Sequence, residues 1–134
     1  MAENFEHGRY EFLKKGRSPY ACARLCGEED GSVRGSLSFY DTPLGVLVCA
    51  EVEGMRSSEG VYGFCFGEDG CREREDACLL LPLIYTRRGH GRASLISEGL
   101  RRIPLRGRRV YLRESRTAPL CLSRILAQGV IEGG

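Results

Sequence analysis

The sequence predicts an all-β protein, and three observations lead to this prediction. The 134 residues include 18 glycines and no tryptophan. Val46, Val48, Ala50 and Val52 fall on one face of residues 46–52, and aromatic residues alternate with small ones along residues 62–67, which is the pattern of strands with one buried face. Clusters rich in glycine, proline and aspartate separate such stretches. We expect a single domain of short strands, large enough to form a core without disulfides.

The first half of the chain divides into an arm and three strands. Residues 1–19 are polar and irregular, and we expect them to form an arm or an added strand ahead of a domain spanning residues 20–134. The predicted strands are residues 20–26, 32–40 and 46–52. Turns at residues 27–31 and 41–45 separate them, so the three strands are predicted to form a meander.

The clearest strand signal lies in residues 61–71, which end in a glycine-rich acidic turn. The aromatic residues should share the buried face, with small residues opposite: Tyr62, Phe64 and Phe66 against Gly63, Cys65 and Gly67. Pro82 interrupts the apolar run 77–85, which favours an irregular buried segment or an edge strand. Residues 87–92 are expected to form a basic turn, residues 93–96 give a weak strand signal, and residues 99–104 resemble a loop.

The last part of the chain contains one good strand and one ambiguous segment. Residues 105–114 contain a predicted strand, which begins after a turn glycine, Gly107. Residues 118–128 fit a short helix stopped by Gly129, although a strand stays open. Residues 129–131 are expected to be extended.

Charge is distributed unevenly along the chain. The net charge is +2, yet residues 87–124 hold eleven arginines against two acids, whereas residues 1–86 hold fifteen acids and nine bases. We interpret most of these arginines as a solvated face, with a basic patch as the alternative. The patch would consist of Arg87, Arg88, Arg108, Arg109, Arg113 and Arg124.

Residues 1–17 have no apolar run like that of a signal peptide, and no segment is apolar over the length of a membrane span. We therefore expect a cytoplasmic protein without membrane contact. The seven cysteines should then be mostly reduced thiols, and we expect most of them to be small buried hydrophobic residues. Aromatic residues are sparse among the arginines, so nucleic-acid binding is not expected.

An ordered set of segments resembles the copper-zinc superoxide dismutase family. The set comprises Val33-x-Gly35-x-Leu37-x-Phe39, residues 46–54, Gly60 to Glu68, Gly70-Cys71, Gly107-Arg108-Arg109-Val110 and Gly129-Val130-Ile131. It spans residues 20–131. The resemblance implies an eight-stranded Greek-key β-barrel or sandwich, and kinship with proteins of superoxide metabolism.

The same resemblance implies that the metal site is dismantled. The family's copper strand reads Gly-Phe-His-x-His-Glu, but Cys65 and Gly67 stand at its two histidine positions. A further copper histidine corresponds to Leu79 and the last one to Arg113. His90 is the one histidine left at a position that resembles a ligand, in the family's zinc segment. The cysteine that should pair with Cys71 is replaced by Gln128.

The sequence therefore predicts a non-catalytic superoxide-dismutase-like domain that has a binding or structural role and no cofactor. The alternative is a rebuilt copper or zinc site made of Cys65, Cys71, Cys78 and His90, because thiolates select Cu(I) or Zn(II). The partner would be a protein or a small ligand, and a homodimer stays open. No nucleophile-base pattern or phosphate loop supports another enzyme class.

Overall fold

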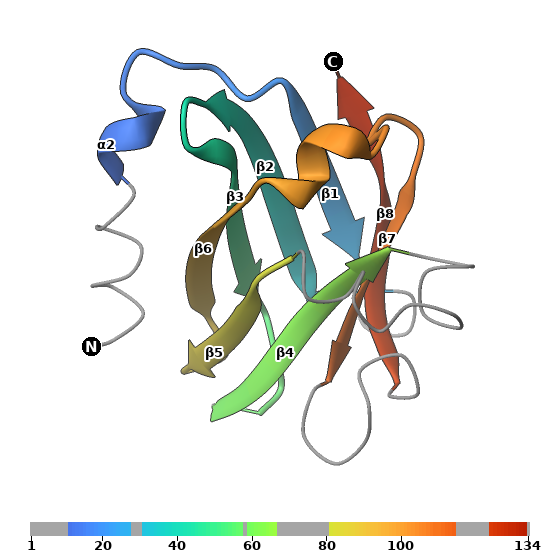
Figure 1. Cartoon of the computed structure of the whole chain (residues 1–134). Coiled ribbons are helices and arrows are strands. Elements are labelled where there is room, and N and C mark those ends of the chain that lie inside the picture. The colour runs from blue at the N-terminus through green and yellow to red at the C-terminus, as the bar shows by residue number, and fades with distance from the viewer. Residues whose placement is uncertain (1–10, 28–30, 58, 67–80, 115–123, 134) are drawn as a thin grey trace.

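The computed structural model describes residues 11–27, 31–57, 59–66, 81–114 and 124–133. These residues form an antiparallel sheet that curls into a nearly closed barrel (Figure 1). Its strands are β1 Ala21–Cys26, β2 Arg34–Thr42, β3 Gly45–Glu53, β4 Glu59–Phe66, β5 Leu83–Arg87, β6 Gly91–Ser97, β7 Arg109–Glu114 and β8 Ile125–Gly133. A short helix, α2 Glu11–Lys14, precedes the sheet, and a 3₁₀ helix, η1 Gly99–Arg102, follows β6. No helix in this part of the chain is long and apolar enough to cross a membrane.

The strand order is β5-β4-β7-β8-β1-β2-β3-β6, and every neighbouring pair runs antiparallel. The two end strands, β5 and β6, are consecutive in the chain. A two-residue turn joins them, and Arg87 and His90 exchange backbone hydrogen bonds of 2.8 and 3.0 Å across it. Arg88 and Gly89 in this turn both have positive φ, 55° and 76°, as a type I′ hairpin requires. This turn brings the two ends of the sheet together.

Alternation along the strands produces the core. In β2 and β3, Leu37, Phe39, Val48 and Val52 point inward and are fully buried. The aromatic face predicted for β4 is confirmed, since Tyr62, Phe64 and Phe66 are at most 5% exposed. Two leucines outside the strands, Leu100 and Leu105, belong to the same core cluster. The segment of η1 crosses one end of the barrel (Figure 1).

Close backbone approach fixes two glycines. A Cβ at Gly129 in β8 would collide with the carbonyl oxygen of Arg24 in β1, so this position admits no larger residue without a shift of one strand. Gly54, after β3, has φ of 74°, and a Cβ there would collide with the carbonyl oxygen of Ser32. Glycine alone combines that backbone angle with the tight contact.

The structure corrects several predictions about individual elements. Within the predicted arm, residues 11–14 form a turn of helix rather than an irregular segment or a strand. The basic turn is shorter than expected, because β6 already begins at Gly91 and runs through the weakly predicted residues to Ser97. Residues 125–128 belong to β8 and not to a helix.

Pro82 lies just before β5, which is an end strand of the sheet order, as the edge alternative predicted.

Candidate functional site

The outer face of β4 and β7 contains two of the positions that the sequence comparison assigned to copper ligands. Cys65 in β4 lies opposite Tyr111 in β7, and Arg113, two residues further along β7, lies opposite Gly63. Cys65 and Arg113 are therefore diagonal neighbours on one face, a relationship that places Cα atoms about 7–8 Å apart. Positions 65 and 113, far apart in the sequence, are therefore close enough that suitable side chains there could bind one ion together.

The side chains on this face do not suit a copper ion. Arg113 carries a permanent positive charge and stacks over the Tyr111 ring, with its Cζ 5.5 Å from the ring centroid. A guanidinium has no lone pair to donate to a metal and repels a cation. Cys65 is fully buried even though it lies on the outer face. One thiol beside a guanidinium is a poor donor set for either metal of the family.

His90, the remaining candidate ligand, lies at the other end of β4. The β5–β6 turn begins after Arg87, and Arg87 pairs with Glu59 in β4. Glu59 comes six residues before Cys65, so the two are about 20 Å apart along the strand. His90 is exposed, and its Nε2 lies 3.7 Å from Oε2 of Glu51. The structure therefore does not bring Cys65 and His90 together.

The other cysteines differ in exposure. Cys71 and Cys78, both candidate ligands, lie outside the described residues. Cys22 and Cys26 are exposed and Cys49 is half-buried, so the prediction of buried cysteines is correct for Cys65 but wrong for the two in β1. The four described cysteines are thiols, without a disulfide among them. Across residues 11–66 and 81–133, apart from the gaps given above, no three His, Cys, Asp or Glu side chains are grouped as metal ligands.

The basic patch predicted from the sequence is divided between the two ends of the barrel. Arg108 and Arg109 lie at the start of β7, where Arg109 pairs with Val130 near the end of β8. Arg87 and Arg88 lie at the β5–β6 turn, and Arg124 precedes β8, both at the opposite end. Arg113 lies between the two groups. These six residues do not form one surface.

A different set of arginines gathers at the end of the barrel that η1 crosses. The patch proposed from the sequence contained Arg108 and Arg109 of this set but not its other members, and residues 99–104 were interpreted as a loop. The buried Leu100 and Leu105 hold this segment on the core, whereas Arg101 and Arg102 between them are exposed. We call the exposed set the arginine rim: Arg101, Arg102, Arg106, Arg108 and Arg109.

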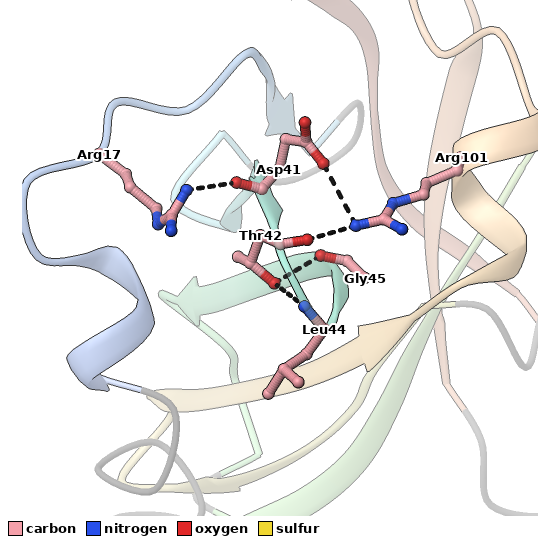
Figure 2. A network of polar contacts seen from close by, with 6 residues as sticks. All are labelled: Arg17, Asp41, Thr42, Leu44, Gly45 and Arg101. Carbon is pink, nitrogen blue, oxygen red and sulfur yellow. Dashed lines mark hydrogen bonds and ion pairs between the residues drawn. The ribbon is translucent and has the colours of Figure 1, made fainter.

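A polar network connects the rim to the β2–β3 turn (Figure 2). Arg101 donates from Nη2 to the carbonyl oxygen of Thr42, and the same nitrogen lies 3.6 Å from Oδ1 of Asp41. Arg17, from the segment before β1, donates from Nη1 to the carbonyl oxygen of Asp41 at 3.0 Å. Segments far apart in the sequence are thereby attached to one turn.

The charges of this network affect the pKa of Tyr20. Burial raises the pKa of its phenol above the ordinary value of 10.0, and the negative charge of Asp41 raises this pKa further. Arg101 acts in the opposite direction and lowers the pKa. The phenol stays protonated at neutral pH, so Tyr20 is no candidate general base.

A shallow groove of about 400 Å³ on the outer face of β1, β2 and β3 is the candidate small-ligand site. Its charged side chains are Arg24, Arg34, Glu51 and Glu53. Glu51 already accepts a 2.6 Å hydrogen bond from Nε of Arg92. Equal numbers of positive and negative groups give this groove no preference for a charged ligand.

Comparisons with known proteins add no identification. No protein-family model matches the chain, and no curated protein matches its sequence.

Proposed function

We propose that this chain is a non-catalytic relative of the copper-zinc superoxide dismutases, with a Greek-key barrel that has lost its metal site and acts by binding a partner. The strand order supports the Greek-key part. With β5 and β6 joined at the turn, the order around the barrel includes β3-β6-β5-β4. Three consecutive antiparallel strands with a fourth beside the first are the defining feature of a Greek key.

The relationship between Cys65 and Arg113 carries the proposal. Both occupy positions at which the resembling family has copper ligands, and both lie on the same outer face of neighbouring strands. This nearness supports the resemblance, because the copper ligands of that family also have to meet at one ion. These two residues do not replace the family's imidazole ligands, because a guanidinium has no lone pair for a metal and a thiol favours Cu(I) over a copper that alternates between two oxidation states.

The binding role is inferred from the core and the outer surfaces of the barrel. The described residues form a well-packed core and several charged or grooved outer surfaces. A fold that retains its framework after losing its reactive groups can still present surfaces to a partner. The proposed activity is therefore recognition, with no covalent step.

The test is a superoxide dismutation assay on protein that has been incubated with copper and zinc and then freed of loose metal. We expect a rate no higher than that of buffer treated in the same way. A rate well above this control would overturn the proposal and favour the alternative of a rebuilt thiolate site. The matched variant Cys65→Ala would then show whether Cys65 takes part.

A further inference from the structure

We propose that the arginine rim is a docking surface for a carboxylate-rich segment of a partner protein. This inference rests on the proposed binding role, to which it adds a location and a chemical class of partner. It does not depend on the state of the metal site.

Exposed arginines outnumber acids at this end of the barrel. The five arginines of the rim are exposed within nine residues of sequence. The described acids at the same end are Asp41, Glu98 and Glu132, and Asp41 already lies 3.6 Å from Arg101. At the opposite end the register sets acids against arginines, Glu53 against Arg34 and Glu59 against Arg87. The rim therefore carries five exposed arginines against three described acids, one of which is already close to Arg101.

Three guanidinium groups of the rim are held in place by a single hydrogen bond each. Nε of Arg108 donates to the carbonyl oxygen of Pro104 at 2.8 Å, and Nη1 of Arg109 donates to Oε1 of Gln128 at 2.9 Å. Arg101 donates from one nitrogen to Thr42. A guanidinium has five N–H donors, so each group keeps further donors for a ligand. Orientation by the protein reduces the entropy that a partner must overcome.

The backbone beneath these side chains is also fixed. Gly107 donates to the carbonyl oxygen of Ile131 at 2.8 Å, and Ile131 donates to that of Arg108 at 2.8 Å. Together with the buried Leu100 and Leu105, these bonds attach the rim to β8 and to the core. A surface on a rigid support can present a lasting arrangement of donors.

The chemistry favours carboxylates of a protein over a nucleic acid. Single-stranded nucleic acids bind through exposed aromatic rings as well as phosphate contacts. The ring of Phe66, at this end of the barrel, is 2% exposed and lies under Arg108, whose Cζ is 5.5 Å from the ring centroid. It offers no free face to a base. The net charge of +2 also gives only a weak long-range attraction for a polyanion.

The test measures fluorescence anisotropy of a labelled oligoglutamate peptide and of an equally labelled oligothymidylate. The test variant is R102Q/R106Q, because within the described residues Arg102 and Arg106 make no hydrogen bond or ion pair that the fold would lose. The control variant R87Q/R88Q removes the same charge from two exposed arginines at the other end. Thermal unfolding of both variants verifies that they fold.

We expect the peptide to bind the unmodified protein. Its affinity should fall about fivefold or more with R102Q/R106Q and should stay within about twofold with R87Q/R88Q. Binding should also weaken with added salt. Three results would overturn the inference: no peptide binding, an equal loss in both variants, or tighter binding of the oligothymidylate than of the peptide. The dismutation assay on the same preparation tests the proposed function separately, so failure of one is distinguishable from failure of the other.

Discussion

The hydroxyl of Thr42 donates a 2.7 Å hydrogen bond to the carbonyl oxygen of Gly45 and accepts one of 3.2 Å from the backbone N–H of Leu44 (Figure 2). Thr42 is 2% exposed, so water cannot replace these bonds. The β2–β3 turn, to which the arginine rim is attached through Arg101, therefore depends on one buried hydroxyl.

Replacement of Thr42 by valine keeps the shape of the side chain and removes the hydroxyl. Two backbone groups then lose their partner, and we expect the free energy of unfolding to fall by about 1–3 kcal/mol. Urea denaturation measures this change. Thr42→Ser is the control, since it keeps the hydroxyl and should cost clearly less than the valine. A valine variant as stable as the unmodified protein, together with a destabilised serine variant, would show that packing of the methyl group, and not the hydroxyl, matters at this position.

Tyr20 should make stability depend on alkaline pH. Its pKa is raised above 10.0 in the folded protein, chiefly by burial. The unfolded chain therefore releases this proton first as the pH rises, so the stability that Tyr20 contributes is present below pH 10 and is lost as the pH rises through the folded pKa. Between about pH 9 and pH 11 the unmodified protein should lose more stability than Tyr20→Phe does. Parallel stability curves would contradict this expectation.

Thiol reactivity should follow exposure. Cys22 and Cys26 are exposed, whereas Cys65 is fully buried. In the native protein, iodoacetamide should modify Cys22 and Cys26 well before Cys65, and in denaturant the three rates should become similar. Mass spectrometry of the peptides measures each rate. Early modification of Cys65 in the native protein would mean that the outer face of β4 is open to solvent.

Gly129 should tolerate no side chain. A Cβ there would meet the carbonyl oxygen of Arg24, and separation of β8 from β1 should cost about 1–3 kcal/mol of stability. Gly31→Ala is the matched control, because a Cβ at Gly31 has nothing within 4 Å. Unfolding by urea compares the two variants. A Gly129→Ala protein as stable as Gly31→Ala would show that the two strands can move apart freely.

Regular alternation made much of the sheet predictable from the sequence. Val46, Val48, Ala50 and Val52 share one face of residues 46–52, the aromatic residues share one face of residues 61–66, and both stretches are strands. β6 gave a weak signal, since its outer positions include Arg92 and Ser94 and its inner ones include the small Ala93. Its position depends on pairing with β3, which a local pattern does not contain.

β8 was ambiguous because of an irregularity in its pairing. The register with β7 shifts between Leu112 and Arg113, which pair with Ala127 and Ile125. Leu126 is the extra residue. It follows Ile125 without apolar–polar alternation, and with Leu122 the two have the i, i+3, i+4 spacing of one helix face. A bulge of this kind is a property of two strands together.

The candidate site shows the same limit. The substitutions of Cys65 and Arg113 for copper ligands could be recognised in the sequence, but their position on one outer face required the register of β4 and β7. The arginine rim could be predicted only in part: Arg108 and Arg109 belonged to the predicted patch, but the grouping of all five arginines depends on the burial of Leu100 and Leu105 at the end of the barrel. Spacing along the chain alone does not distinguish such a surface from a solvated loop.

Metal stoichiometry tests the central claim most directly. The protein would be equilibrated with Cu(I) or Zn(II) under reducing conditions, dialysed against a weak chelator and analysed by mass spectrometry for bound metal, beside Cys65→Ala. We predict substoichiometric metal that is the same in both proteins, because Arg113 occupies the face that Cys65 shares. One equivalent of tightly bound metal that Cys65→Ala abolishes would contradict the claim that the site is dismantled.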